Sequence, residues 1–288
     1  MKLELKINTE RETREYSVLN RIILQGARYK NGGSDSVKTS DVSLMYEKAS
    51  SSKRHVKYQR MHLKKDGKRS FSNPVEHYFL KVEDPMNILD LHLTPEGQFD
   101  DLLNYDEVMK RWGYTKIYLD KYFVSDDEQV LDTIHGWTNL VDSRVKDKRQ
   151  FFKILQEDLL LSRLFYGYYM DYGESGCYVH NVMFPNFFGS SKLVLQETLR
   201  LEKSNRGNRV TINGLINDVE SDVNAICEYI GVELNFYKQL SFLLTGKCDF
   251  DEEGLLTNLE FHIKAELTDK DFKKEIILLI DKDNHGRQ

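Results

Sequence analysis

The chain has few cysteines, few prolines and no long hydrophobic run. Its three cysteines, Cys177, Cys227 and Cys248, are too few and too scattered for a disulfide framework or a zinc-binding spacing. With four prolines and 40% hydrophobic residues in a chain of 288, the composition is that of a globular protein. No window approaches the roughly 18 consecutive apolar residues of a membrane-spanning helix, and the opening MKLELKINTE is unlike a secretory signal. We therefore expect a cytoplasmic protein with no membrane insertion.

The motifs of common nucleotide, cofactor and metal sites are also missing. Neither a G-x-x-x-x-G-K-[ST] phosphate loop nor a G-x-G-x-x-G after a predicted strand occurs, and the histidines have no H-E-x-x-H spacing. The segment DKDNHG near the C-terminus begins like a calcium loop but lacks the distal glutamate. We therefore predict no cofactor, no metal and no enzymatic activity.

One segment, residues 172–189, gathers residue types that are typical of catalytic sites. Its GESGC has a cysteine, Cys177, where the nucleophile elbow G-x-S-x-G needs glycine, although Ser175 fits the serine. Cys177 and His180 would form a dyad only if both side chains converged, and on a strand a spacing of three sends them to opposite faces. Glycines before the segment and Pro185 after it favour a packed strand.

The parity of this strand predicts the surroundings of its cysteine. Cys177 shares one face with Val179 and Met183, while His180 shares the other with Tyr178. Because the first set is apolar, we expect a buried Cys177 thiol that reacts slowly.

Several tyrosines lie close together in the sequence before this strand. They offer apolar rings with polar tips, as a ligand pocket does, although helical spacing would also gather them in a core. The possible pocket residues are Tyr166, Tyr168, Tyr169 and Tyr172.

The hydrophobic periodicity predicts an α+β fold. Antiparallel β-rich regions at the N- and C-termini flank a helical middle segment. Period-two patterns predict strands that include VEHYFLKVE (75–83) and the regular alternation of 259–267, whereas 104–168 reads as mainly helical. We divide the chain into a basic β-rich domain ending in a helix (1–124), a helical segment (125–170) and an α+β domain (171–288). Trp137 and Phe261 are the expected large core residues.

Charge is distributed unevenly along the chain. Residues 1–70 hold 17 Lys+Arg against 8 Asp+Glu, a net of +9, whereas the remainder holds 24 against 38, a net of −14. Residues 53–69 carry eight cations and one carboxylate, on what we predict to be a hairpin with a bulge near Gln59 or Arg60. The hairpin is either a solvated edge or a contact with an acidic protein surface. The predicted contact residues are Lys57, Arg60, Lys64 and Lys65.

The expected function follows from the missing motifs and the basic segment. We predict a non-enzymatic interaction or assembly protein that binds a protein partner or itself. The alternative is a small-molecule or lipid binder with an aromatic-lined pocket, and a hydrolase using Cys177 or Ser175 is the third hypothesis. Nucleic acid is not the expected partner, because the chain as a whole is acidic and repels a polyanion.

Overall fold

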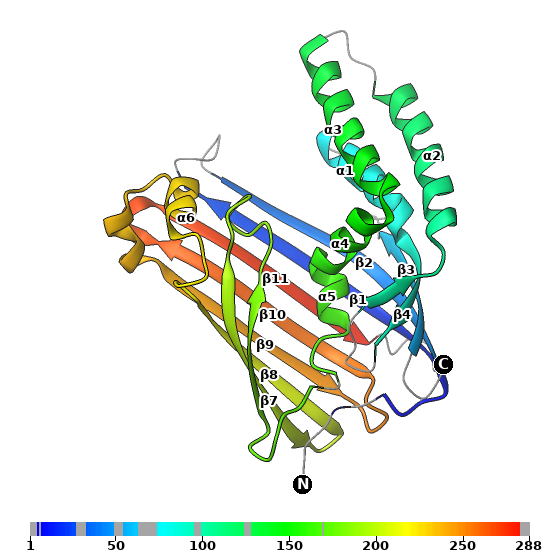
Figure 1. Ribbon diagram of the computed structural model, residues 1–288, viewed down its shortest axis with the longest axis vertical. Helices are drawn as coiled ribbons and strands as arrows, with labels where there is room; N and C mark the ends of the chain where they lie inside the picture. Colours follow the sequence, from blue (N-terminus) through cyan, green and yellow to red (C-terminus); the bar gives the residue numbers. More distant parts are fainter. Residues whose placement is uncertain are drawn as a thin grey trace. The chain divides into compact units, whose positions relative to one another are not determined.

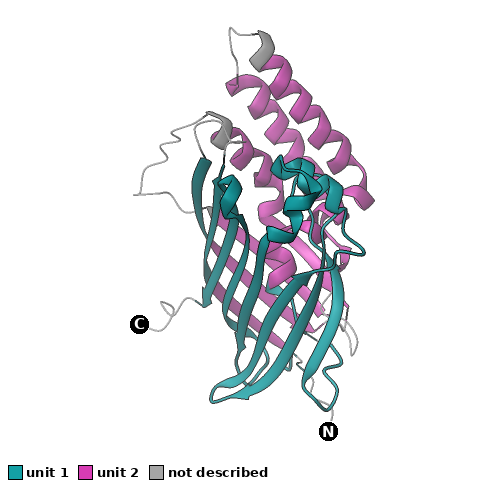
Figure 2. Ribbon diagram, turned by 90° about the vertical axis from the view of Figure 1, so that its left-hand side faces the viewer, with its two compact units in different colours: residues 1–8, 16–40, 164–288 teal, residues 9–15, 41–163 magenta. Residues whose placement is uncertain are grey.

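The computed structural model describes residues 5, 7–26, 33–48, 54–62, 74–94, 99–123, 128–168 and 170–282. The chain falls into two compact units, which are coloured separately in Figure 2. Unit 1 comprises residues 1–8, 16–40 and 164–288, and unit 2 comprises residues 9–15 and 41–163. Each unit therefore joins segments that are far apart in the sequence, whereas the three predicted segments are each continuous.

The fold is α+β, with a large antiparallel sheet and several helices (Figure 1). The described strands are β1 (Arg11–Gln25), β2 (Gly33–Lys48), β3 (Arg54–His62), β4 (Ile88–Leu93), β5 (Phe99–Leu102), β6 (Cys177–Met183), β7 (Val194–Ser204), β8 (Gly207–Ile216), β9 (Ser241–Phe250), β10 (Leu256–Leu267) and β11 (Phe272–Lys282). Their order along the 11-stranded sheet is β5-β4-β3-β2-β1-β11-β10-β9-β8-β7-β6. The ends of this order are β5 and β6.

Along the chain, the described helices lie between strands. They are α1 (Pro74–Glu83), α2 (Tyr105–Tyr122), α3 (Glu128–Lys146), α4 (Lys148–Glu157), α5 (Leu159–Leu164) and α6 (Val223–Ile230), with 3-10 turns at Asp84–Asn87, Leu234–Gln239 and Thr268–Lys270. Within the described ranges, none of the helices has the length and apolar character needed to cross a membrane.

The strand predicted at 75–83 is wrong, because these residues form helix α1. Pro74 opens the helix at the position where its missing N–H costs nothing and its fixed φ is already helical. Tyr78, Phe79 and Val82 recur at helical spacing, which competes with the alternation in the same letters. Tyr78 is buried, and its hydroxyl lies 2.9 Å from the Thr138 hydroxyl of α3. This contact between helices outweighs the local strand pattern.

The core of unit 1 lies on one face of its strands, which we call the inner face. On β10 the alternation predicted for 259–267 is confirmed, and Phe261, which the sequence placed in the core, is 1% exposed. Phe184 stacks against Phe261 with ring centroids 6.3 Å apart, and Phe187 meets Phe242 at 6.2 Å. The loop after β6 therefore covers the inner face with aromatic rings.

Strand β11 lies between strands from opposite ends of the chain. It pairs with the neighbouring β10 on one side and with β1 on the other, in a register that includes Ile22↔Ile276. Figure 1 shows the red β11 beside the blue β1. The sheet of unit 1 is therefore completed by a long-range pairing.

Trp137 is not in the core, contrary to the prediction, and is 36% exposed. The buried positions of α3 include Thr138 and Val145, and Trp137 lies beside this face. Its ring packs against Phe79, with centroids 5.4 Å apart, and against Tyr78 at 5.8 Å. Apolar spacing identified the correct stripe of the helix but not the part of it that faces the neighbouring helices.

A carboxylate joins α2 to α3 in unit 2. Asp142 accepts a hydrogen bond from the buried Trp112 indole at 2.8 Å, and it is ion-paired with Lys116 at 2.9 Å and Lys146 at 2.6 Å. Burial alone would raise the pKa of Asp142, but these three donors outweigh it and lower the pKa to about 2, from an ordinary 3.8. The ionised carboxylate therefore stabilises the packing of the two helices.

We expect Asp142→Asn to lower the free energy of unfolding by about 1–2 kcal/mol at pH 7, because it removes the negative charge to which three side chains donate hydrogen bonds. The folded pKa lies below the ordinary value, so this stability is complete above pH 4 and is lost as the pH falls toward 2. Urea denaturation at several pH values measures both effects. Asp132→Asn, at an exposed position of the same helix, is the matched control. An equal loss in both variants would contradict the assigned role.

Candidate functional site

Strand β6 belongs to unit 1 and is the last strand in the order of the sheet. Its hydrogen-bonded neighbour among the described strands is β7, in a register from Cys177↔Arg200 to Met183↔Val194. The strand predicted within residues 172–189 is therefore confirmed. His180 lies opposite Glu197 on the inner face, while Cys177 and Met183 lie on the outer face.

On one side of the β6 backbone the structure describes no neighbouring strand. Just beyond the strand, Phe184 N–H donates to Leu193 O at 2.8 Å. Antiparallel neighbours exchange hydrogen bonds at alternate residues, so the even-numbered residues of β6 bond to β7. The N–H and C=O groups of Val179, Asn181 and Met183 therefore point toward the open edge, where the sheet order contains no further described strand.

The outer side chains of β6 are apolar and exposed. Val179 is 56% exposed and Met183 is 52% exposed, while Cys177 is half-buried. The prediction of a packed apolar face around Cys177 is therefore wrong, since the apolar residues of this face meet solvent. In the same outer face, Leu215 of β8 lies in one cross-strand row with Asn181 and is also exposed.

The two ends of the strand order differ in the protection of their edges. β5 has four residues, Phe99–Leu102, two of which are aspartates, and Asp101 is ion-paired with Lys148 at 2.9 Å. Short length and charge are the usual devices that prevent an edge from pairing with another chain. β6 has seven residues, CYVHNVM, without Lys, Arg, Asp, Glu or Pro. It therefore lacks these devices.

Behind the edge, on the inner face, β6 contacts a buried carboxylate. Glu197 of β7 is 0% exposed, and the Tyr166 hydroxyl donates to its Oε2. His180 Nε2 lies 2.8 Å from the Tyr166 oxygen and 3.8 Å from Glu197 Oε2. Because the phenol has a single proton and gives it to Glu197, His180 donates its Nε2–H to the phenol oxygen. The three side chains connect the segment before β6 to β6 and β7.

The sequence contained a signal for Glu197 that the predictions did not use. Leu195, Leu199 and Leu201 share one parity of β7 and are buried, and Glu197 occupies the same parity. A carboxylate in such a series needs a partner, because an uncompensated buried charge is costly. The identity of the partners depends on long-range packing.

The tyrosine cluster belongs mainly to the core. Tyr168 is buried, with its ring 5.1 Å from that of Phe250, and the buried Tyr172 donates its hydroxyl to Gly167 O at 2.7 Å. Burial raises the pKa of Tyr172. Tyr166 is half-buried beside Glu197, and Tyr169 lies outside the described residues. Of the four predicted pocket residues, Tyr166 is therefore the one placed near the candidate site.

The predicted basic contact residues have different surroundings. Lys57 is exposed on β3, whereas the Arg60 side chain is 12% exposed and hydrogen bonds to Glu83 at 3.2 Å and Asn87 at 3.1 Å. The β3–β4 register is unbroken from Arg54↔Leu93 to Gln59↔Ile88, so the described pairs contain no bulge at Gln59. Lys64 and Lys65 lie outside the described residues. Arg60 is thus part of an internal polar cluster of unit 2.

The geometry does not assemble the residues of the hydrolase hypothesis. Ser175 is exposed in the turn before β6, where its Oγ lies 3.4 Å from the backbone nitrogen of Cys177. His180 faces the inner side and contacts Tyr166, away from the face of Cys177. The three side chains therefore do not converge on one point.

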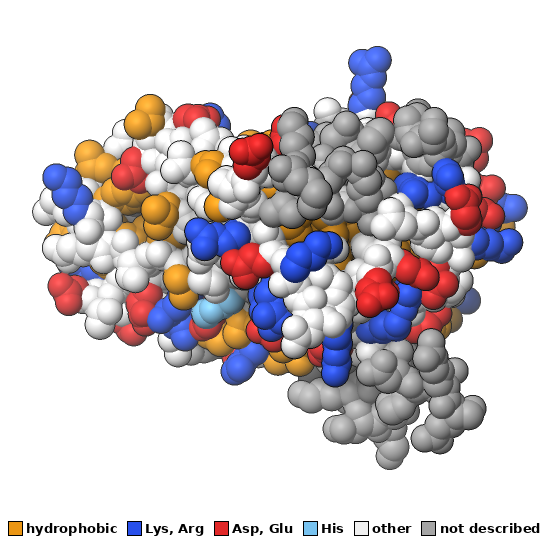
Figure 3. Space-filling view, turned by 90° about the horizontal axis from the view of Figure 1, so that it is seen from below, with side chains coloured by type: hydrophobic (Ala, Val, Ile, Leu, Met, Phe, Trp, Pro, Cys, Tyr) orange, Lys and Arg blue, Asp and Glu red, His pale blue; other side chains and the backbone are white. Residues whose placement is uncertain are grey.

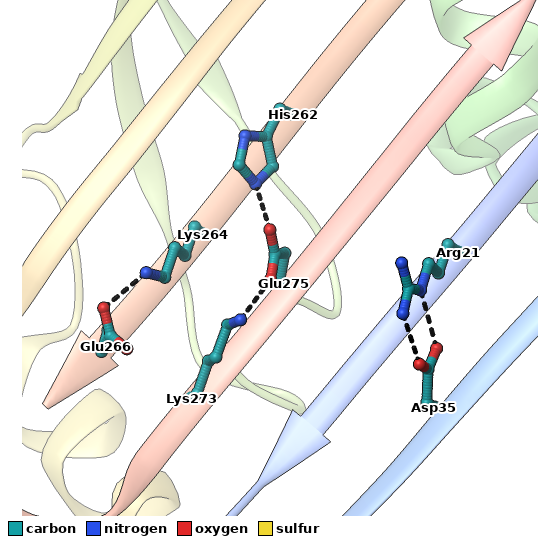
Figure 4. A network of polar contacts seen from close by, with 7 residues as sticks. All are labelled: Arg21, Asp35, His262, Lys264, Glu266, Lys273 and Glu275. Atoms are coloured by element: carbon teal, nitrogen blue, oxygen red, sulfur yellow. Dashed lines mark hydrogen bonds and ion pairs between the residues drawn. The ribbon is translucent and has the colours of Figure 1, made fainter. Parts of the chain in front are cut away.

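Charged side chains on the outer face of β1, β2, β10 and β11 form internal ion pairs (Figure 4). Arg21 binds Asp35 through two hydrogen bonds of 2.9 and 2.6 Å, which lower the pKa of Asp35. Burial alone would raise the pKa of Glu275, but hydrogen bonds from Lys273 and His262 outweigh it and lower that pKa. Cations and anions also lie side by side on the surface seen in Figure 3. These charges neutralise one another.

A second histidine cluster lies in unit 2. His55 contacts Asp90 through Nε2 and Glu47 through Nδ1 at 3.5 Å, and its ring meets that of His92 at 5.8 Å. Across the residues that the structure describes, no group of three or more His, Cys, Asp or Glu side chains is arranged to hold a metal ion.

We expect Cys177 to react with a water-soluble maleimide within minutes at neutral pH, because it lies half-buried at the open edge. The buried Cys227 and Cys248 react only after unfolding, and burial raises the pKa of the Cys227 thiol. Intact-mass spectrometry should therefore show one fast label per chain, which Cys177→Ser removes. Fast labelling of two thiols, or of none, would be inconsistent with this placement.

We expect Tyr166→Phe to destabilise the protein by about 1–3 kcal/mol, because it removes a donor from a fully buried carboxylate. Adding Glu197→Gln to this variant should recover part of the loss, since the amide no longer carries the buried charge. Thermal and chemical denaturation of the two single variants and the double variant measure the coupling. Tyr114→Phe, at an exposed tyrosine of α2, is the control. Additive losses would show that Tyr166 and Glu197 act independently.

Comparisons with known proteins do not assign the chain to a family. No family model matches it, and no curated protein is significantly similar to it.

Proposed function

We propose that the protein is a non-enzymatic cytoplasmic interaction protein that binds an extended segment of another protein chain by strand addition to β6. The observation that carries this proposal is the open edge, where three residues of β6 direct their backbone groups away from β7. In strand addition, main-chain hydrogen bonds give affinity and alternate side chains give specificity. The edge supplies both kinds of contact.

The side chains of β6 favour a protein segment over a charged ligand. Val179 and Met183 are about half exposed, and covering them would contribute roughly 1 kcal/mol each. β6 itself has no Lys, Arg, Asp or Glu, so the added segment needs no complementary charge. The expected segment alternates apolar residues at the positions that face Val179 and Met183.

Two features make the edge more suitable than other surfaces. The Tyr166, His180 and Glu197 contacts fix the inner side of β6, so that little ordering is needed when a strand is added. The basic side chain of Arg60 is already bound within unit 2, and the buried Tyr168 and Tyr172 do not offer an open lining for a small molecule.

Val179→Lys tests the proposal, because an outward lysine on an edge strand opposes the approach of another strand. The tagged wild type and the tagged variants serve as baits to recover partners. Untagged copies of the chain are present, so that a second copy can also be recovered. We expect the tagged Val179→Lys variant to recover at least tenfold less of the partner than the tagged wild type does. In the recovered complex, the amides of Val179, Asn181 and Met183 should exchange hydrogen more slowly than in the isolated chain.

Leu243→Lys is the matched control. Leu243 is an exposed apolar residue on the same outer face, but it lies on β9, which has neighbours on both sides. We expect this variant to retain the partner. A partner that is recovered equally with Val179→Lys, or a complex in which the β6 amides exchange as in the isolated chain, would refute strand addition at this edge.

A further inference from the structure

We infer that the segment added to β6 is β6 of a second copy of the chain, in an antiparallel pair centred on Asn181. This inference rests on the proposed function and names its partner. The two edges would be related by a twofold axis, so that each presents the same surface to the other.

The outward backbone groups restrict the possible registers. In an antiparallel pair, residues that exchange hydrogen bonds must both point toward the other strand. On β6 these are the odd-numbered residues, so an outward residue must face an outward residue of the second copy. A twofold axis at any residue of β6 satisfies this condition, and the three most central axes lie at Val179, His180 and Asn181.

The axis at Asn181 gives the best match of side chains. It places each Val179 opposite Met183 of the other copy, and this contact occurs twice. Directly opposite residues have Cβ atoms roughly 4.5–5.5 Å apart, so these two exposed apolar pairs would cover each other. Asn181 lies opposite itself in the centre.

Asn181 can also complete hydrogen bonds across the axis. One hydrogen of its Nδ2 group is donated to Glu220 at 2.5 Å. The amide has a second hydrogen and a carbonyl oxygen, which allow reciprocal bonds with Asn181 of the second copy. A polar pair at the centre of an apolar contact fixes its register.

The other two central registers are less favourable. The axis at His180 would place two imidazoles opposite each other, which repel when both are protonated, and it would set Val179 against Asn181. The axis at Val179 would place Met183 opposite residue 175, which precedes the strand, and leave it without an apolar partner.

The absence of charge on β6 favours self-pairing. On an isologous edge the residue at the axis faces its own copy, and the residues on either side face other positions of the same strand, so a strand with charges of a single sign repels its copy. CYVHNVM has no carboxylate, lysine or arginine. A pair of seven-residue strands is smaller than a standard protein interface, so we expect a concentration-dependent dimer with a Kd on the order of micromolar or weaker.

Sedimentation of the purified wild type, Val179→Lys and Leu243→Lys over about 1–500 µM, a range that brackets the expected Kd, tests the partner. The wild type and Leu243→Lys should approach the dimer mass, and Val179→Lys should associate at least tenfold more weakly. Oxidation of Asn181→Cys then tests the register. Paired Cα atoms at this position would be roughly 5.5 Å apart, within the range of a disulfide, so a reducible dimer should form.

The wild type provides the control for register, because its Cys177 would lie opposite Pro185 and should not cross-link. Cross-linking through Cys177 as fast as through Asn181→Cys would overturn the register, and a dimer unaffected by Val179→Lys would overturn the β6 interface. A wild type that stays monomeric throughout would overturn self-pairing. If Val179→Lys nevertheless loses a recovered partner, strand addition stands with a different chain, and the two proposals are thereby separated.

Discussion

The need of every backbone N–H and C=O group for a hydrogen-bond partner governs this protein. Inside the sheet, antiparallel neighbours meet that need, as β9 and β11 do for β10. At the ends of the strand order, one side of each strand has no neighbour among the strands that the structure describes. β5 limits the problem through short length and aspartates, whereas β6 does not. The same requirement that stabilises the sheet therefore leaves the backbone groups at the β6 edge available to pair with another strand.

The buried carboxylate behind β6 links stability to the proposed contact. Glu197 is held by Tyr166, and His180 on the edge strand completes the cluster. A group of this kind is costly to disturb, because removing one donor leaves a charge in the apolar interior. The edge strand is consequently fixed from its inner side. A rigid edge loses less conformational entropy on binding than a loose one.

Local patterns in the sequence predicted the regular elements well where one face is simply buried. The alternation of β10 and the strand character of residues 177–183 are confirmed. Helix α1 was missed because its sequence fits both the strand period of two and the helical period of 3.6 residues. The contact of Tyr78 with α3 decides between them, and this contact is long-range. Trp137 was misplaced because apolar spacing does not define which part of a stripe meets a neighbour.

The candidate site was harder to predict, for a physical reason. Parity correctly separated Cys177 from His180, but which face of β6 is buried depends on the order of strands in the sheet. Edge position is a property of that order, and it has no local signature. The sequence does indicate that Glu197 is unusual, because it is a carboxylate among leucines of the same parity. Its partners, Tyr166 and His180, lie on other segments, so the sequence pattern does not identify them.

The pairing of β1 with β11 has a consequence for synthesis on the ribosome. Ile22 pairs with Ile276, which is made about 250 residues later, and at 5–20 residues per second the interval is roughly 13 to 50 s. During this time β1 emerges without the strand that will flank it in the finished protein. A nascent chain of this topology exposes early strands before their partner strands exist, and this is the state in which chains misassemble with one another.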